Sequence, residues 1–240
     1  MRFNQLSRRI VNRVIRGLPS RYQLKALTCF RLLSGDVDPE LARLAEYLPA
    51  NRRCTAIDVG ANNGVVSCVL AKFFDSVHAI EPNPGLTARW AAYAPPNVTV
   101  HTMALSDRCG VATLQIPVSR GIELEGWASL GTPGAENIDD LRQVEVKCCT
   151  LDSLEISHHR VDFIKLDVEG HEIPALEGAK DCIARWQPWL IVEAWDRAAI
   201  VGKLAELGYT VLPLDELLDT RIQSPNIAFR PTCVVPMVTH

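Results

Sequence analysis

The length, composition and charge of the chain set the first limits on its class. Its 240 residues fit one large α/β domain, or a domain with a short extension. Hydrophobic residues make up 48% of the chain, and no apolar run reaches the roughly 18 residues that a membrane-spanning helix needs. The net charge is −3, but residues 1–35 contain eight Lys or Arg and no acid, so the rest is strongly acidic. An acidic body repels phosphates and argues against nucleic acid as the main partner.

The eight cysteines are scattered and form no C-x-x-C pair, so a thiolate zinc site is not expected. Several lie in apolar runs, where cysteine acts as a small hydrophobic residue. We therefore expect a reducing, cytoplasmic setting.

The first 33 residues are predicted to be helical, because apolar residues recur there at helical spacing between arginines: Phe3, Leu6, Ile10, Val14 and Leu18. Pro19 and Ser20 divide this segment into two helices. It either packs on the domain or lies as a basic amphipathic helix on an anionic membrane surface. A third helix follows, with Pro39 near its first turn and Leu41, Leu44, Ala45 and Leu48 on one face. These helices form a predicted extension over residues 1–50.

The body of the chain alternates strands and helices. Strands are predicted at 54–59, 77–81 and 98–105, with helices at 64–74 and 84–93 between them, which indicates a parallel sheet. Residues 111–118 and 143–149 have the alternation of strands. Residues 119–142 show no period, and this loop either covers a substrate with Trp127 and Ser129 or is a surface excursion.

The alternation of strands and helices that is typical of a parallel sheet resumes after residue 161. We predict a strand over 162–167, a helix from Glu172 to about Arg185, and a strand over 189–194 that ends near Glu193. A helix over 198–207 is closed by Gly208, and 209–214 and 227–230 are the candidate final strands.

The stretch T-A-I-D-V-G-A-N-N-G, residues 55–64, has the pattern of a buried strand that turns through glycines into a helix. In this layout backbone N–H groups approach a ligand closely, and a side chain on Gly60 would block that approach. The third glycine of the dinucleotide fingerprint is missing, and Asp58 precedes the turn. An acid there suits a cationic ligand such as S-adenosylmethionine, and Glu81 after the next strand can accept bonds from two ribose hydroxyls. The alternative is an ordinary strand–turn–helix with a capping acid.

A second group of ionisable residues, Asp167, Glu169, His171 and Glu172, lies at a later strand-to-helix junction. Ligands bind outside the carboxyl ends of the strands in open parallel sheets. Five acids are expected to project at that edge, one from each of five strand ends: Asp58, Glu81, Asp107, Asp167 and Glu193. One such acid is often a helix cap, whereas five together indicate a site.

These residues carry a specific resemblance. D-F-I-K-L-D-V-E-G-H-E at 162–172 resembles the hallmark of FkbM-type methyltransferases, and further motifs follow the family in order: D-V-G-A-N-N-G at 58–64, E-P-N-P at 81–84, A-L-S-D at 104–107, T-L-D at 150–152 and I-V-E at 191–193. The resemblance covers roughly residues 54–196. It implies an α/β fold with a Rossmann-like, mostly parallel seven-stranded sheet, helices on both faces, and a methyltransferase domain over residues 51–240.

The resemblance also implies the cofactor S-adenosylmethionine and a set of residues around it. Asp58, Gly60 and Gly64 would line its methionine end, Glu81 would hold the ribose, and Ser106 with Asp107 would reach the adenine amino group. Asn62, Asn83 and Asp167 lie in the same motifs and are assigned to the cofactor with them. Family members mostly methylate hydroxyl oxygens of sugars or secondary metabolites, so a small-molecule or glycan acceptor is expected.

The sulfonium is already a good leaving group, so the protein mainly positions the acceptor and removes its proton. His171, Asp167 and Glu169 are the candidate bases. Alternatively Asp167 and Glu193 hold Mg²⁺, with Asp196 as a further ligand, as carboxylates do in catechol O-methyltransferase. A nicotinamide-dependent oxidoreductase and a cofactor-binding scaffold without catalysis are the competing functions. The basic N-terminal helix leaves peripheral contact with the inner membrane surface open.

Overall fold

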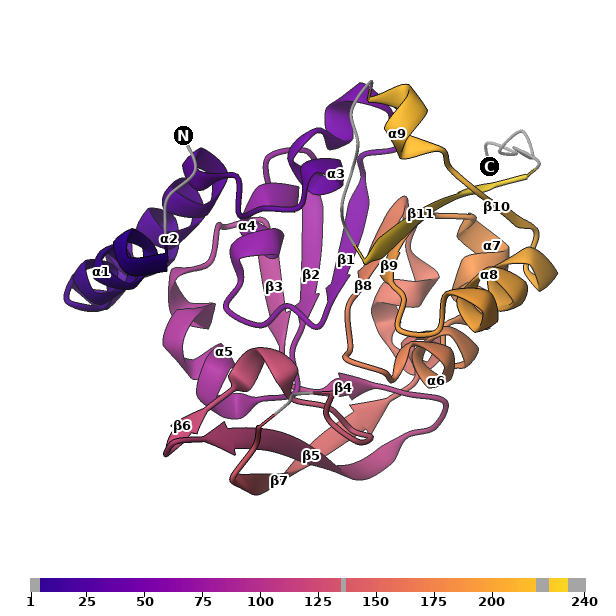
Figure 1. The fold of residues 1–240 in the computed structure, drawn as a ribbon. Coiled ribbons are helices and arrows are strands. Elements are labelled where there is room, and N and C mark those ends of the chain that lie inside the picture. The colour runs from indigo at the N-terminus through magenta and orange to yellow at the C-terminus, as the bar shows by residue number, and fades with distance from the viewer. Residues whose placement is uncertain (1–4, 135–136, 219–224, 233–240) are drawn as a thin grey trace.

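The computed structural model describes residues 5–134, 137–218 and 225–232. Its main layer is a seven-stranded sheet of order β10-β11-β9-β8-β1-β2-β3 (Figure 1). Five strands run parallel: β1 (Thr55–Val59), β2 (Ser76–Ile80), β3 (Val98–His101), β8 (Phe163–Leu166) and β9 (Trp189–Glu193). At one edge β11 (Asn226–Pro231) runs antiparallel to β9 and to β10 (Tyr209–Val211). The predicted Rossmann-like fold with a mostly parallel sheet is confirmed.

Side-chain alternation along β1 divides the core between the two faces of the sheet. Ile57 and Val59 belong to a cluster with residues of α6 (Glu172–Glu177), α7 (Lys180–Trp186) and α8 (Arg197–Glu206). Ala56 faces the other side and packs with α4 (Val65–Leu70), the side that α5 (Pro84–Trp90) also covers in Figure 1. Because strand side chains alternate, Asp58 falls on the same face as Ala56.

Three predicted helices are shorter or divided. The helix expected over 64–74 ends at Leu70, and the one over 84–93 becomes a 3-10 turn, η2 (Ala91–Tyr93), after Trp90. The helix expected from Glu172 to Arg185 breaks between α6 and α7. At this break a Cβ atom on Gly178 would lie 2.0 Å from the carbonyl oxygen of Ser106, so close packing against that loop requires glycine.

The N-terminal helices form as predicted, with α1 (Gln5–Arg16) and α2 (Ser20–Ser34) divided at Pro19. Phe3 lies outside the described residues. Leu24 of α2 packs with Trp90 of α5, which attaches the helical pair to the sheet layer. The third helix is split into α3 (Pro39–Ala42) and η1 (Leu44–Glu46). Leu41 and Leu44 are fully buried in the α4-side core, so residues around them stabilise the α/β domain, and a domain boundary at residue 50 stays a prediction.

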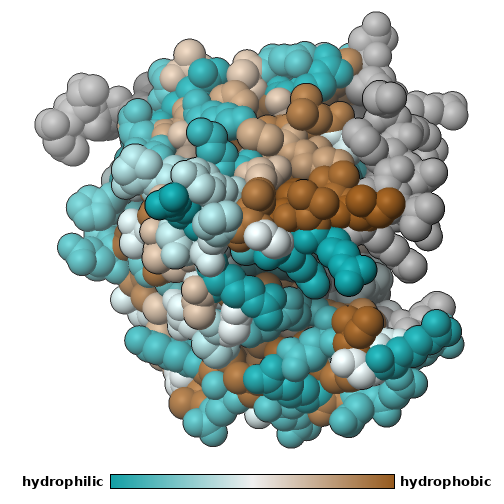
Figure 2. All heavy atoms as spheres, turned by 90° about the vertical axis from the view of Figure 1, so that its left-hand side faces the viewer, coloured by the Kyte–Doolittle hydropathy of each residue, from teal (hydrophilic) through white to brown (hydrophobic). Residues whose placement is uncertain are grey.

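The outer face of α1 leaves apolar side chains in solvent. Ile10 and Val14 are 56% and 61% exposed. On the face of the molecule that carries α1 and α2, hydrophobic residues gather in a band bordered by hydrophilic ones (Figure 2). Within the described ranges, no helix has the length and hydropathy to cross a membrane. The seven cysteines of the described part are free thiols, and Cys233 lies outside it.

A second, four-stranded sheet of order β4-β7-β5-β6 was not predicted. The single strand expected over 98–105 breaks at Thr102 and Met103, and its second part, β4 (Ala104–Leu105), pairs with β7 (Asp140–Cys149). Strand β5 (Gly110–Ser119) pairs with β7 in antiparallel fashion and with β6 (Ile122–Glu123) at the rim. The small sheet lies across the carboxyl ends of β1, β2 and β8 (Figure 1).

Candidate active site

A cavity lies between the carboxyl edge of the large sheet and the small sheet. Its floor is formed by the ends of β1, β2 and β8, and its roof by β5 and the segment around η3 (Glu125–Trp127). Predicted site residues that line it are Gly60, Asn62, Glu81, Asp167, Glu169 and His171. The structure therefore brings both predicted motifs to one cavity.

The glycine turn has protein neighbours where a ligand was expected. Gly60 has a φ of 82°, and a Cβ atom there would lie 1.7 Å from the backbone oxygen of Asp167. Gly64 has a φ of 77°, and its Cβ would lie 2.7 Å from the Trp90 ring. The reason first given for Gly60, ligand approach, is therefore incomplete: the close contact of two strand ends already requires glycine.

Asp58 does not lie at the cavity. It is 1% exposed, and its Oδ2 accepts a hydrogen bond of 2.5 Å from the Ser67 hydroxyl of α4. Burial raises the pKa of Asp58 to about 6, although the Ser67 hydrogen bond and the Lys165 ammonium lower it. The expectation that Asp58 projects at the sheet edge is wrong, because its place in β1 turns it under α4. Its assignment to the cofactor stays a prediction.

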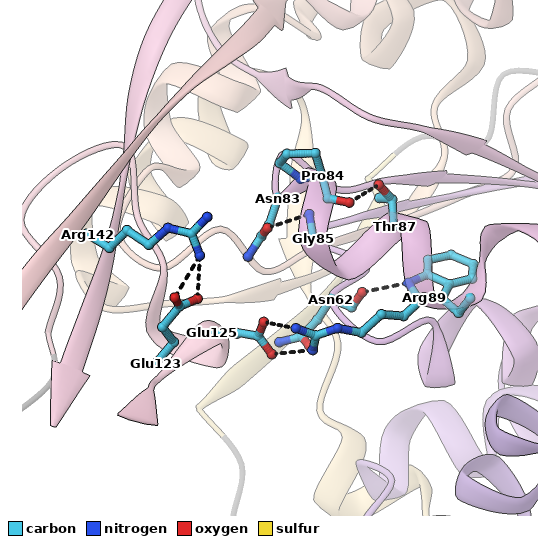
Figure 3. Close-up of polar contacts among 10 residues, drawn as sticks. Asn62, Asn83, Pro84, Gly85, Thr87, Arg89, Glu123, Glu125 and Arg142 are labelled. Atoms are coloured by element: carbon cyan, nitrogen blue, oxygen red, sulfur yellow. Dashed lines mark hydrogen bonds and ion pairs between the residues drawn. The ribbon is translucent and has the colours of Figure 1, made fainter. Parts of the chain in front are cut away.

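Glu81 is the most strongly positioned acid of the cavity. It is 5% exposed, and its two oxygens accept hydrogen bonds of 2.8 Å from the backbone N–H groups of Asn62 and Asn83. Burial raises the pKa of Glu81 to about 7. Asn83 caps α5 by accepting from the Gly85 N–H, and its buried Nδ2 has no hydrogen-bond partner within the described part of the chain. Figure 3 shows Asn83 at the start of α5 and Asn62 beside the Arg89 side chain.

Ser106 and Asp107 follow β4 and therefore belong to the small sheet. The Ser106 hydroxyl lies 3.0 Å from Asp107 Oδ1 and 2.9 Å from His171 Nε2. His171 thus lines the cavity with one ring nitrogen already engaged, and burial lowers the pKa of its imidazole. The adenine contacts of Ser106 and Asp107 stay a prediction, since neither side chain lines the cavity.

Three carboxylates meet at the ends of β8 and β9. Asp167, Glu169 and Glu193 each offer an oxygen within 4.8 Å of the others. A hydrogen bond with Asp167 raises the pKa of Glu193 to about 9. Burial acts to raise the pKa of Asp167, but the Lys165 ammonium, 3.3 Å away, holds it below its usual range. Burial and the neighbouring Asp167 raise the pKa of Glu169 to about 7.

This group contains the predicted metal ligands Asp167 and Glu193 and adds Glu169. Carboxylate oxygens are ligands that Mg²⁺ accepts. Asp196 is not part of the group, because its Oδ1 accepts from the Ala199 N–H, 3.0 Å away, and so caps α8. The prediction that Asp196 is a further ligand is therefore wrong, and a metal at Asp167 and Glu193 stays a prediction.

The roof of the cavity comes from the predicted loop, but from other residues than expected. Gly126, Ala128 and Leu130 line the cavity. Trp127 is 43% exposed and packs edge-on against Trp195, and Ser129 is buried, with its hydroxyl donating to the backbone oxygen of Glu169 at 2.7 Å. The loop therefore covers the cavity, which was one of the two alternatives predicted for it. The residues that line the cavity are Gly126, Ala128 and Leu130, and not the expected Trp127 and Ser129.

Two residues of the site were not predicted from the sequence. Lys165 is 1% exposed and donates to Asp167 and to Asn226, and a lysine inside an apolar strand was the available signal. Glu125 lines the cavity and forms a bidentate ion pair with Arg89, at 2.8 Å for both contacts (Figure 3). No local pattern predicts that pair, because its members are 36 residues apart.

Comparisons with known proteins found a matching family model and several similar solved structures. A family model described as the methyltransferase FkbM domain matches residues 58–211. No curated protein matches the sequence. A methyltransferase FkbM structure from Methylobacillus flagellatus KT is similar at 17% identity and a TM-score of 0.44, covering 94% of this chain. This chain spans only 59% of that protein.

Two other solved structures show similar resemblance. A TehB-like SAM-dependent methyltransferase from Corynebacterium glutamicum has 13% identity and a TM-score of 0.46, with 89% of this chain and 99% of that chain covered. Magnesium protoporphyrin IX methyltransferase from Synechocystis, solved with bound SAM, has 13% identity and a TM-score of 0.40, with 95% and 84% covered.

Proposed function

The chain belongs to the FkbM methyltransferase family, whose model matches more than half of its residues, and from this premise we propose that it is an S-adenosylmethionine-dependent O-methyltransferase. The acceptor group is a hydroxyl of a carbohydrate or secondary metabolite. The observation that carries the proposal is the buried Glu81 carboxylate at the floor of an acidic cavity, beside a cluster of carboxylates that can accept a proton.

The charge of the cavity suits this cofactor. Glu81, Glu125, Asp167 and Glu169 line it, and a bound cation would favour the ionised forms of Glu81 and Glu169, whose pKa values burial raises to about 7. When bound, S-adenosylmethionine supplies a methyl group on a positively charged sulfur, which an acidic cavity attracts. A pyrophosphate, as in a nicotinamide cofactor, would be repelled there, which disfavours the oxidoreductase alternative.

Glu81 has the geometry to hold a ribose. The Asn62 and Asn83 N–H groups each occupy one lone pair of its oxygens and fix the plane of the carboxylate. An ionised carboxylate has about four acceptor positions, so both oxygens can still accept from neighbouring hydroxyls. The hydroxyl donors would keep the buried carboxylate ionised.

We place the general base at Glu169. Its side chain lines the cavity, and its backbone, at a φ of 51°, is held by the Ser129 hydroxyl. Asp167 is engaged by Lys165 and Glu193, and His171 Nε2 by Ser106, whereas the hydrogen bond between Trp195 and the Glu169 carboxylate favours the ionised form that acts as a base. Glu169 would accept the proton of the acceptor hydroxyl, and S-adenosylmethionine, when bound, would supply the methyl group that the hydroxyl oxygen receives.

Magnesium at Asp167 and Glu193 is the second candidate for lowering the hydroxyl pKa. The three close carboxylates favour it, whereas the Lys165 ammonium already neutralises Asp167 and competes with a cation. Both accounts use the same cavity and differ in their response to a chelator.

The test is methyl transfer from S-adenosylmethionine labelled in its methyl group to a panel of sugar and polyhydroxylated acceptors, followed by mass spectrometry. The proposal expects one labelled methyl on an acceptor oxygen and loss of the product with the Glu169→Gln variant. Label on nitrogen or carbon would refute O-methylation. A folded, cofactor-binding enzyme that methylates nothing in a broad panel would support the scaffold alternative.

A further inference from the structure

A second cavity lies between the N-terminal helices and the α/β core, next to the cofactor cavity. Its volume is about 210 Å³, and its walls come from α1, α2, the glycine turn, α5 and η3. Asn62 and Glu125 line both cavities. Asn62 and Glu125 therefore form a wall that the two cavities share.

Three arginines from three different helices line the second cavity: Arg16 of α1, Arg31 of α2 and Arg89 of α5. Arg89 forms the bidentate pair with Glu125, which Figure 3 shows reaching from α5 to the roof segment. Across the described ranges, no ion pair joins Arg16 or Arg31 to an acid. Two guanidinium groups thus remain available to a ligand.

Buried apolar side chains and amide side chains form the rest of the wall. Ile15, Leu24 and Leu86 line the cavity and are buried, and Trp90 contributes with its Nε1 fixed on the Asn62 backbone oxygen at 2.9 Å. Gln23 is likewise oriented, since its Nε2 donates to the Leu18 oxygen at 2.8 Å. A pocket that combines apolar side chains with charged groups fits a ligand with a compact body and a charged substituent.

The two neighbouring cavities have opposite charge. The cofactor cavity presents carboxylates, whereas the second cavity presents arginines with a single acid, Glu125, at their boundary. An anionic group is repelled by the first and attracted by the second. Guanidinium groups also match the geometry of oxyanions, to which they donate pairs of hydrogen bonds.

We propose that the second cavity binds an oxyanion of the methyl acceptor, a carboxylate, sulfate or phosphate, through Arg16 and Arg31. This inference rests on the proposed function and deepens it, since it makes the acceptor an anionic glycan or metabolite. The acceptor then has a defined orientation. Its anionic end lies among the arginines, and its neutral hydroxyl extends past Asn62 and Glu125 toward the methyl group.

Calorimetric titration with inorganic pyrophosphate tests the site without requiring turnover. The proposal expects saturable binding to the wild-type protein, and affinity reduced about tenfold by Arg16→Gln and by Arg31→Gln, the usual effect of losing one charge-assisted contact. Arg13→Gln is the matched control, because Arg13 is an exposed arginine of the same helix that does not line the cavity. It should change the affinity by less than about twofold.

A variant with the opposite sign guards against unfolding as an explanation. Glu125→Gln removes the boundary acid and releases Arg89, so pyrophosphate should bind more tightly. Each variant is also titrated with S-adenosylmethionine, which should retain its wild-type affinity in Arg31→Gln. That result separates the acceptor site from the cofactor site, and cofactor binding tests the proposed function independently.

Three outcomes would overturn the proposal. The first is no pyrophosphate binding to the wild-type protein, or weaker binding to Glu125→Gln. The second is equal loss in Arg13→Gln, which would show a general basic surface. The third is a parallel loss of S-adenosylmethionine affinity in Arg31→Gln, which would assign the arginines to the cofactor's own carboxylate.

Discussion

Asp58 and Glu81 are both buried acids near the ends of adjacent strands, but their carboxylates have different partners. Asp58 contacts a side-chain hydroxyl of α4, whereas Glu81 contacts two backbone N–H groups at the cavity. Of the two, only Glu81 lines the cavity. Asp58 instead joins β1 to α4, so the stability of this packing should depend on whether the Asp58 carboxyl is protonated.

Asp58→Asn is therefore expected to change stability in a pH-dependent way. Burial raises the pKa of Asp58 in the folded protein to about 6 from 3.8, so its stabilising effect is present below pH 3.8 and is lost as the pH rises through 6. The difference in unfolding free energy, variant minus wild type, should therefore be about 2–3 kcal/mol larger at pH 8 than at pH 4. Urea unfolding at both pH values measures this gain, and an equal difference at both would contradict the assignment.

Glu169 is the proposed general base, and its removal should mainly affect turnover. Glu169→Gln should lower turnover by about 10²–10⁴ with little change in cofactor affinity, because it removes a proton acceptor. Burial raises the pKa of this carboxyl to about 7, and only its ionised form is a base, so kcat/KM should increase with pH until about 7 and then level off.

His171→Asn is the matched comparison for Glu169. It keeps a polar side chain beside Ser106 and should cost much less activity than Glu169→Gln. If His171→Asn were the more damaging variant, the base would be the imidazole. If a chelator abolished activity and Mg²⁺ restored it, the carboxylates would act as metal ligands.

The elements of the site are joined by a close backbone contact between the glycine turn and the end of β8. Gly60→Ala places a Cβ atom 1.7 Å from the Asp167 oxygen and forces a φ of 82° on alanine. We expect destabilisation by more than about 2 kcal/mol, since strain and displacement of β8 add. Gly202→Ala is the control: nothing lies within 4 Å of its Cβ in α8, and it should stabilise by about 0.5–1 kcal/mol. Thermal unfolding of both variants decides the matter, and a neutral Gly60→Ala would contradict the contact.

The exposed face of α1 is expected to bind anionic membranes. Ile10 and Val14 stand in solvent on a helix that ends in Arg13 and Arg16, the arrangement of helices that lie on anionic membranes. Sedimentation with vesicles containing phosphatidylserine should show salt-sensitive binding, weakened by Val14→Ser. Val111→Ser is the control, because Val111 is equally exposed, at 65%, on β5. Equal effects of both substitutions, or no vesicle binding at low salt, would leave α1 as a packing element only.

At the scale of the whole molecule, the sequence predicts the large sheet well and the small sheet poorly. Strands β1, β2, β8 and β9 are short apolar runs with a glycine or acid after each, a local signal. The small sheet depends on β4 leaving the line of β3 and pairing with β7, some 44 residues away, which no local pattern encodes. The motifs also locate the cavity, because they lie at the carboxyl ends of these strands.

Within the site, the remaining errors arise from side-chain direction and from distant pairs. Asp58 was expected at the edge because it precedes the turn, yet alternation from Ile57 already places it on the α4 face. Trp127 and Ser129 were chosen over Gly126 and Ala128 in a loop without a period. The Arg89–Glu125 pair and the second cavity depend on how α5 meets the roof, which only the fold reveals.

The proposed methyl transfer depends on S-adenosylmethionine binding at Glu81. The direct measurement is calorimetric titration of the wild-type protein and Glu81→Gln with S-adenosylmethionine and, separately, with NAD. The wild type should bind S-adenosylmethionine at one site and leave NAD unbound, and Glu81→Gln should weaken the affinity by at least about tenfold, the loss of about 1.4 kcal/mol from hydrogen bonds to a charged acceptor. Wild-type affinity in Glu81→Gln, or binding of NAD in place of S-adenosylmethionine, would contradict it.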